Sequence, residues 1–177
     1  MISLRSIDEK ELEEIHSYQN SDCTRDVAEF FDMPVKWAPM SIAEIREKIE
    51  GEKDNKRIRY FSIWHENDFV GIGTFTSNWD TWGPYAGIVI WPEFRNKGLG
   101  TEAAKQLLDM SFLENPAHAM VQGAPDWNIP SIGLIKKLGF KEAGRMRDAD
   151  MKNGKHHDWL FFDILKSEYI KTRGVES

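Results

Sequence analysis

The stretch that most constrains the fold is WPEFRNKGLGTEAAK, residues 91–105. The apolar run YAGIVIW leads into it, and a segment with apolar residues at helical spacing leads out of it. A nearly continuous apolar strand is typical of a strand that is covered on both faces. The pattern therefore predicts a layered fold in which a glycine-bearing turn joins a buried strand to a helix.

Hydrophobic spacing and turn residues extend this pattern over the chain. Alternating apolar residues indicate strands, apolar residues three or four apart indicate helices, and Gly, Pro, Asn or Asp mark the turns. The expected strands cover 2–5, 58–77 as a hairpin turning at His65–Asp68, 85–91, 118–124, 140–147 and 156–165. The expected helices cover 6–19, 41–52, 100–114 and 130–139. This order predicts one mixed α/β (α+β) domain over residues 1–177, with a parallel crossover in its second half.

Particular residues predict where some of these elements begin and end. Ser41 and Glu44 have the spacing of a capping box at the start of the second helix. Gly51 is expected to end that helix. Asn153-Gly154 predicts a tight hairpin turn between the last two strands, because both residues accept a positive φ.

Composition narrows the class of protein. Charged residues make up 29% and hydrophobic residues 41% of the 177 residues, as in a globular domain large enough to bury a core. The net charge of −6 argues against a surface that follows nucleic-acid phosphates. A single cysteine, Cys23, rules out an internal disulfide. The first residues lack the apolar core of a signal peptide, and no apolar run reaches the roughly 18 residues of a membrane span. We therefore expect a cytoplasmic protein.

The turn at 95–101 has the composition of an anion site. The first N–H groups of a helix have no intrahelical partner, and the helix dipole adds partial positive charge at that end. Gly98 and Gly100 let a phosphate approach the main chain, Thr101 adds a hydroxyl, and Arg95 and Lys97 add positive charge. The alternative is a glycine turn whose two cations are merely solvated. The pattern Arg-x-x-Gly-x-Gly matches neither a P-loop nor the three-glycine dinucleotide fingerprint.

Four segments together resemble the GNAT superfamily of acyl-CoA-dependent N-acetyltransferases. They are LRSIDEKELEEI, PEFRNKGLGTEA, NIPSIGLIKKLGF and NGKHHDWLFFDIL, and they are spread over most of the chain. Within that superfamily the chain is most similar to the branch of the RimJ/RimL ribosomal-protein N-terminal acetyltransferases and the spermidine acetyltransferases. The resemblance implies a single-domain GNAT fold: a central mixed, largely antiparallel sheet with a splayed pair of parallel strands, flanked by helices.

The resemblance also implies where acetyl-CoA, the acetyl donor, binds. It would lie between the splayed strands Tyr85–Trp91 and Ala117–Ala124, with its pantetheine arm paired to the main chain and its pyrophosphate held by the turn. Asn128 would contact the pantetheine arm. The implied cofactor-binding residues are Ile88, Val89, Ile90, Arg95, Asn96, Lys97, Gly98, Leu99, Gly100, Thr101, Asn128 and Ser131. The resemblance implies no metal.

The implied catalytic groups depart in part from the common pattern. The backbone N–H of Ile90, or of a neighbour on that strand, is the implied oxyanion donor. Many relatives carry a tyrosine that protonates the thiolate, and the matching position here is Ile135. The RimL type places a serine three residues after the asparagine, so Ser131 is the implied hydroxyl for the thiolate. The alternative is that Ser131 is a first-turn serine bonded to the backbone.

The sequence leaves the general base open. Relatives often carry a glutamate at the start of the cofactor strand, where this chain has Tyr85, and a phenol with a pKa of about 10 is a poor base. Asp80, in the loop NWDTWG, is the first candidate. The other candidates are Asp126, His118 and His65. His157-Asp158 echoes a His–Asp pair of the RimL type, but a structural cross-strand pair is the preferred interpretation.

The acceptor side is expected to be aromatic and acidic. The candidate substrate-binding residues are Trp37, Trp79, Trp82 and Tyr85. Indole faces bind cations and apolar groups, although core or dimer-interface positions are alternatives for each tryptophan. Four carboxylates near the loop after the first helix would attract a cationic amine, or simply keep the surface soluble: Asp22, Asp26, Glu29 and Asp32.

The main hypothesis is an acetyl-CoA-dependent N-acetyltransferase that moves an acetyl group directly to a primary amine in a ternary complex. The amine is either a protein N-terminal α-amine or part of a small molecule. The alternative is a non-catalytic module that binds and senses acyl-CoA, motivated by Ile135 and Tyr85 at the two family positions. The resemblance allows a homodimer, and no nucleic-acid or membrane partner is expected.

Overall fold

The computed structural model describes residues 1–21, 39–55, 58–76 and 84–173. The chain divides into two compact units. The first unit is Met1–Ser77 with Ala86–Leu107, and the second unit is Asn78–Tyr85 with Leu108–Ser177. Among the helices described, none is long and apolar enough to cross a membrane.

The first unit contains a four-stranded sheet of order β1-β2-β3-β4. Its strands are β1 (Ile2–Arg5), β2 (Ile58–His65), β3 (Asp68–Thr76) and β4 (Tyr85–Ile90). β1 pairs antiparallel with β2, and β2 pairs antiparallel with β3. The hairpin between β2 and β3 turns between His65 and Asp68, which confirms the predicted turn.

Two glycines of β3 show how β4 runs beside it. A Cβ on Gly71 would lie 2.1 Å from the carbonyl oxygen of Val89, and one on Gly73 would lie 3.1 Å from that of Gly87. Numbers rise along β3 while they fall along β4, so this pair is also antiparallel. Only a glycine at position 71 lets the two backbones approach this closely.

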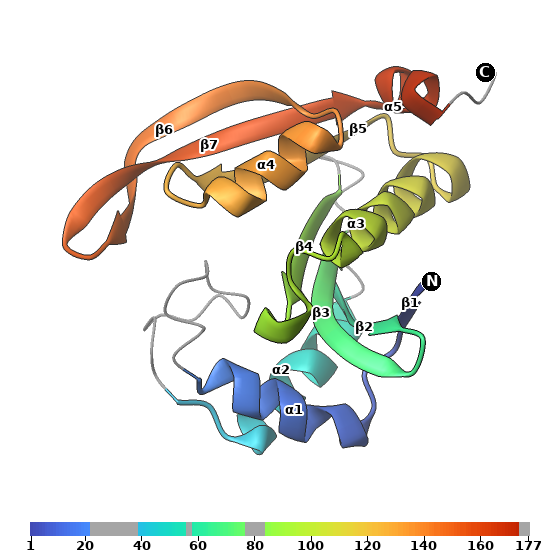
Figure 1. The fold of residues 1–177 in the computed structure, drawn as a ribbon, viewed down its shortest axis with the longest axis vertical. Helices are drawn as coiled ribbons and strands as arrows, with labels where there is room; N and C mark the ends of the chain where they lie inside the picture. Colours follow the sequence, from blue (N-terminus) through green and yellow to red (C-terminus); the bar gives the residue numbers. More distant parts are fainter. Residues whose placement is uncertain (22–38, 56–57, 77–83, 174–177) are drawn as a thin grey trace. The chain divides into compact units, whose positions relative to one another are not determined.

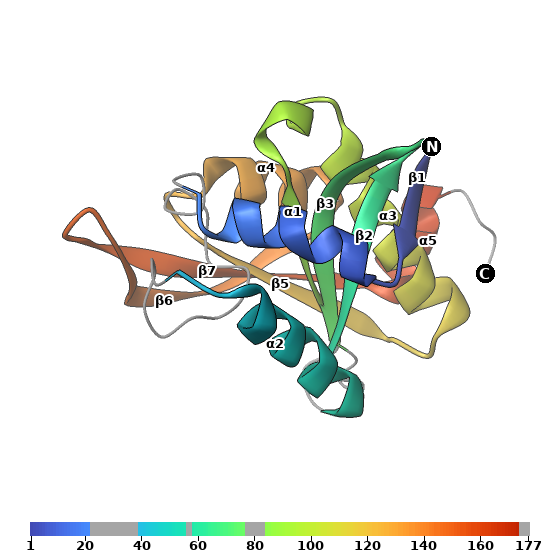
Figure 2. The ribbon, with the colours of Figure 1, turned by 90° about the horizontal axis from the view of Figure 1, so that it is seen from below.

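Helices α1 (Glu9–Gln19) and α2 (Ile42–Asn55) lie against this sheet (Figures 1 and 2). The predicted capping box of α2 is present, since the Ser41 hydroxyl accepts from the Glu44 N–H while the Glu44 carboxylate accepts from the Ser41 N–H. The prediction that Gly51 ends α2 is wrong, because the helix continues to Asn55. A glycine stops a helix when its backbone turns left-handed, and Gly51 is not among the described glycines with positive φ.

The core of the first unit joins these helices to the sheet. Its buried side chains are Ile7, Leu12, Ile15, Tyr18, Met40, Ile45, Ile49, Phe69, Ile72, Val89 and Trp91. The end of β4 is therefore anchored in the core, because Val89 and Trp91 belong to this cluster. Helix α3 (Leu99–Asp109) binds the start of β1: the Ile2 N–H donates to the Glu102 carboxylate at 3.0 Å.

The second unit contains a three-stranded antiparallel sheet of order β5-β7-β6. Its strands are β5 (Ala119–Pro125), β6 (Lys141–Lys152) and β7 (Lys155–Leu165), and α4 (Ile129–Lys137) lies against them (Figure 1). The turn between β6 and β7 is Asn153-Gly154, with φ of 52° and 73°, as the sequence predicts. β6 is longer than the predicted 140–147, because its pairing with β7 runs on to Lys152.

A last helix, α5 (Lys166–Arg173), was not predicted. Its buried residue is Tyr169, and its anchor is Asp109 at the end of α3. The Tyr169 hydroxyl donates to one Asp109 oxygen at 2.9 Å and Arg173 to the other at 2.6 Å. Antiparallel sheets flanked by helices confirm the expected mixed α/β class.

Candidate active site

β4 is the last strand of the first sheet, so one of its edges is open within that sheet. The Trp91 N–H donates to the Val70 carbonyl of β3 at 2.9 Å. Because the N–H and C=O groups of a strand alternate in direction, the Val89 groups also face β3, whereas those of Ile88 and Ile90 face the open edge. Of the three residues expected to pair with a pantetheine arm, Ile88 and Ile90 thus present their main-chain groups to the open edge.

A tight turn follows β4 and leads into α3. A 3₁₀ helix at Pro92–Phe94 comes first, and the Arg95 N–H donates back to the Pro92 carbonyl at 3.2 Å. Asn96 and Gly98 then take positive φ values of 61° and 83°. α3 starts at Leu99, so the N–H groups of 99–101 have no acceptor within the helix.

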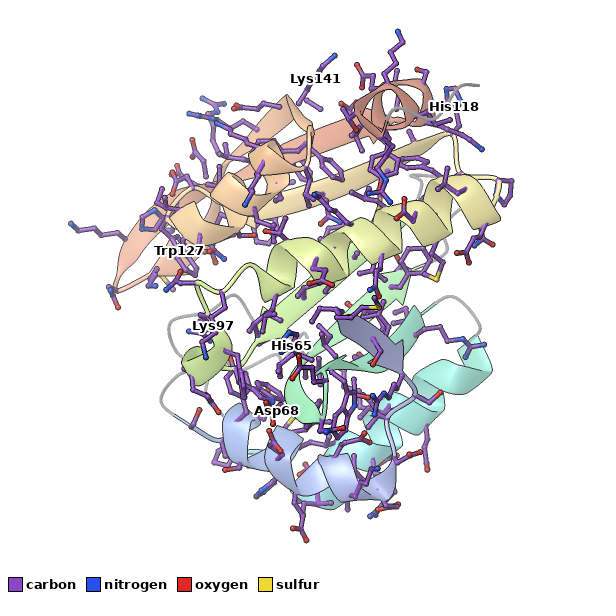
Figure 3. All side chains as sticks on the ribbon, turned by 45° about the vertical axis from the view of Figure 1, so that its right-hand side comes forward. His65, Asp68, Lys97, His118, Trp127 and Lys141 are labelled. Atoms are coloured by element: carbon purple, nitrogen blue, oxygen red, sulfur yellow. The ribbon has the colours of Figure 1, made fainter. Side chains whose placement is uncertain are left out.

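This turn fits a diphosphate. A Cβ at Gly98 would meet no atom of the described protein within 4 Å, so the space beside the turn is open on that side. Lys97 lies in the turn with its ammonium 5.1 Å from the centre of the Phe94 ring (Figure 3). Free amides at a helix start, with a cation beside them, form the kind of site that phosphates occupy.

The Arg95 side chain binds groups of the protein, although its charge suggests a phosphate contact. Its Nε donates to the Ile90 carbonyl at 2.9 Å, and its Nη2 donates to the Tyr18 hydroxyl of α1 at 3.1 Å. The Tyr18 ring packs on Trp91 with 4.4 Å between ring centres. The guanidinium therefore ties the turn to both β4 and α1. Nothing in the sequence pattern singles out Tyr18 as its partner.

The loop between β5 and α4 holds the second predicted group of residues. Asn128 is the N-cap of α4, and its side-chain oxygen accepts from the Ser131 N–H at 3.3 Å. Within the part of the chain that the structure describes, the Ser131 hydroxyl makes no hydrogen bond. The capping is done by Asn128, so the Ser131 hydroxyl is not used to complete the helix start.

If Ser131 has the role that the resemblance implies and protonates the leaving thiolate, Ser131→Ala should lower kcat by about a hundredfold while the CoA Kd changes less than about threefold. Steady-state kinetics and calorimetric titration of CoA measure the two quantities. Asn128→Ser is the matched control: serine keeps the cap, so the melting temperature should hold while CoA binding weakens. An unchanged kcat in Ser131→Ala would leave Ser131 a structural residue.

Asp126, one of the base candidates, is paired with a histidine. The His157 Nδ1 lies 2.7 Å from Asp126 Oδ1, and the Asp126 N–H donates to the Asp158 carbonyl at 2.9 Å. The histidine therefore pairs with Asp126 across the strands rather than with its neighbour Asp158. Asp158 instead binds Arg145 at 3.2 Å.

The same loop is braced by the hairpin of β6 and β7. The Trp127 indole N–H donates to Asp150 at 2.5 Å, and the Lys152 ammonium lies 3.8 Å from the centre of the Trp127 ring. Figure 3 labels Trp127 at this loop. These contacts fix the loop that carries Asn128.

The remaining predicted residues fall into two groups. In the first group, His65 ends β2 at the hairpin turn and His118 is exposed just before β5. Burial raises the pKa of the Tyr85 phenol, so still less of it is ionised and Tyr85 is a still poorer base. The second group lies outside the described residues and consists of Trp37, Trp79, Asp80 and Trp82. Among the residues described, no group of three or more His, Cys, Asp or Glu side chains is placed to hold a metal.

Comparisons with known proteins show the family of this chain. A family model described as "Acetyltransferase (GNAT) domain" matches residues 2–141. The SPbeta prophage-derived uncharacterized N-acetyltransferase YokL of Bacillus subtilis is 28% identical over 139 residues, which are 77% of each chain. The spermidine N(1)-acetyltransferase of Escherichia coli K12 is 29% identical over 83 residues, 47% of this chain and 45% of that one.

Solved structures show the same fold. The spermidine N-acetyltransferase from Vibrio cholerae, crystallised with CoA and spermine, superposes with a TM-score of 0.82 at 23% identity, over 96% of this chain and 98% of that one. An open strand edge that leads into a turn with free helix-start amides fits a ligand with a phosphate group and an extended arm. The chain belongs to the GNAT acetyltransferase family. It is an N-acetyltransferase that uses acetyl-CoA as the acetyl donor.

Proposed function

We propose that the chain transfers acetyl directly from acetyl-CoA to a primary amine, with small cationic amines as the first candidate class. Spermidine acetyltransferases recur among its relatives and among the similar solved structures. We also place the chain in the RimJ/RimL-like branch as one N-acetyltransferase domain over 1–177, so a protein N-terminal α-amine is the second candidate. The open edge of β4, ending in the Gly98 turn, is the observation that carries the proposal.

Each part of this site has a role in that reaction. Acetyl-CoA supplies a thioester whose carbonyl carbon accepts the amine. The N–H groups of the turn would hold the pyrophosphate, and the main chain of Ile88 would pair with the pantetheine arm. The Ile90 N–H faces the open edge and would donate to the carbonyl oxygen where negative charge develops. Ser131 would give its proton to the leaving sulfur, and Asn128 would contact the arm.

The decisive test is a panel of amines with release of free CoA thiol as the readout. The panel contains polyamines, aminoglycosides, amino acids and ribosomal-protein N-terminal peptides. We expect polyamines to give the highest kcat/KM. Tight CoA binding with no acetylated amine anywhere in the panel would instead support the sensing module, and turnover confined to peptides would support the N-terminal acceptor.

The general base can be assigned by comparing two variants. Asp80 remains our first candidate, and Asp80→Asn is expected to lower kcat/KM by about a hundredfold, within the usual range for a removed base. His157 is the rival candidate for the base. Asp126 binds its Nδ1 and so holds the imidazole ring in one orientation, which a general base requires. If His157→Gln rather than Asp80→Asn lowers kcat/KM by about a hundredfold while the CoA Kd is unchanged, the base is His157.

A further inference from the structure

The open edge of β4 ends at the Ile90 carbonyl oxygen. The Ile90 carbonyl faces that edge, but the Arg95 Nε already donates to it at 2.9 Å. The next residue, Trp91, turns its N–H back to β3. The edge groups left for a ligand at this end of β4 are therefore the N–H and C=O of Ile88 and the N–H of Ile90.

The arginine that closes the edge is itself held in place. Its Nη2 donates to the Tyr18 hydroxyl, and the Tyr18 side chain is 9% exposed and packed against Trp91. Figure 1 shows the end of α1 next to the turn that precedes α3. Two of the three guanidinium nitrogens are engaged in opposite directions, toward β4 and toward α1. An arginine held by both bonds keeps one position at the end of the strand edge.

We propose that Arg95 is a positioning residue that ends the open edge of β4 and so sets how far an extended, amide-bearing ligand can slide along the strand. The ligand is the pantetheine arm, so the inference rests on the proposed function. An arm that pairs one step too far would have to share the Ile90 carbonyl with the Arg95 Nε, which already donates to one of its two acceptor positions. Register along the strand in turn places the thioester against the Ile90 N–H.

Two ligands distinguish this role from a direct contact with phosphate. CoA has both the diphosphate and the pantetheine arm, whereas 3′-phosphoadenosine 5′-diphosphate has the diphosphate and no arm. Arg95→Met keeps the length of the side chain and removes the guanidinium. We expect it to raise the CoA Kd by about tenfold to a hundredfold, as measured by calorimetric titration, because the end of β4 and the turn lose the two bonds that hold them in one geometry.

Lys97→Met is the matched control, because it removes the same charge from the same turn without touching Ile90. We expect Lys97→Met to raise the Kd of both ligands by the same factor. We expect Arg95→Met to raise the Kd of the arm-free ligand no more than Lys97→Met does. An equal loss of both ligands in Arg95→Met, or an unchanged CoA Kd, overturns the positioning role. If the wild-type protein binds neither ligand, the proposed function itself fails and not only this inference.

Tyr18→Phe provides a second test that does not depend on Arg95→Met being folded. It removes the hydroxyl that accepts from the Arg95 Nη2 but keeps the ring that packs on Trp91. We expect a loss in CoA affinity of about threefold to tenfold with no change for the arm-free ligand. Combined with Arg95→Met it should add nothing further, because both act through one guanidinium. Additive losses in the double variant contradict the proposal.

Discussion

Gly98→Val should lower the affinity for CoA by about a hundredfold or more. The backbone at Gly98 has φ of 83°, which costs a residue with a side chain roughly 1–2 kcal/mol, and more when the side chain is β-branched. The turn would relax to negative φ and redirect the amides at the start of α3. Losing even one charged amide–phosphate hydrogen bond adds about 1.5–3 kcal/mol to that strain. Calorimetric titration with CoA gives the Kd.

Gly98→Asn separates the effect of backbone strain at position 98 from that of a side chain that blocks the space beside the amides. Asparagine tolerates the left-handed region, as Asn96 does two residues earlier in the same turn with φ of 61°. We expect Gly98→Asn to keep the wild-type melting temperature and to lose about tenfold in affinity, because its side chain enters the space beside the amides. If both variants bind CoA like the wild type, the turn does not hold the diphosphate.

Gly71→Ala should destabilise the protein by about 3 kcal/mol, at the upper end of the usual cost of overpacking. The added methyl group would lie 2.1 Å from the Val89 carbonyl oxygen and 3.0 Å from the Ile90 Cα, which are backbone atoms and cannot rotate away. β4 must then move away from β3, and the open edge at Ile88 and Ile90 moves with it. Urea denaturation measures the free energy of unfolding, and CoA titration reports the displaced edge.

Gly51→Ala is the matched control for this change. It adds the same methyl group at a helical glycine where, among the described residues and apart from the helix's own backbone, no atom lies within 4 Å. Alanine is the better helix former, so we expect the free energy of unfolding to rise by about 0.5–1 kcal/mol. Wild-type stability in Gly71→Ala would mean that β3 and β4 are not as close as this backbone geometry requires.

The elements that sequence reasoning found are those whose cause is local. The capping box of Ser41 and Glu44, the Asn153-Gly154 turn and the strand-turn-helix around Gly98 each depend on residues within a few positions. The elements that it missed depend on distant partners. α5 has no apolar stripe, and its hydrogen bonds go to Asp109, some 60 residues earlier. β6 continues past 147 because the paired residues of β7 hold it.

The candidate site divides in the same way. The residue types for a phosphate turn and for the Asn128 cap could be predicted from the sequence. The positive φ that glycine accepts and the capping by an asparagine side chain are properties of the residues themselves. The open edge of β4 was implied only by the family resemblance, since it depends on which strand becomes its neighbour. The pairing of His157 with Asp126 was not predicted, because the two residues are 31 positions apart and no local pattern links them. Asp80 and the three loop tryptophans stay predictions.

The sequence by itself determined the family of this chain, the order of most of its helices and strands, and the glycine turn that starts α3. Hydrophobic spacing and short-range backbone preferences are sufficient for the elements and the turn, whereas the family followed from the resemblance of four segments spread over the chain. Only the tertiary structure decided what the turn's arginine does. Arg95 reads as a phosphate-binding cation, but Tyr18, 77 positions away, and the Ile90 carbonyl hold its guanidinium. A charged side chain binds whichever acceptors the packing brings near it, and the spacing of residues does not specify them.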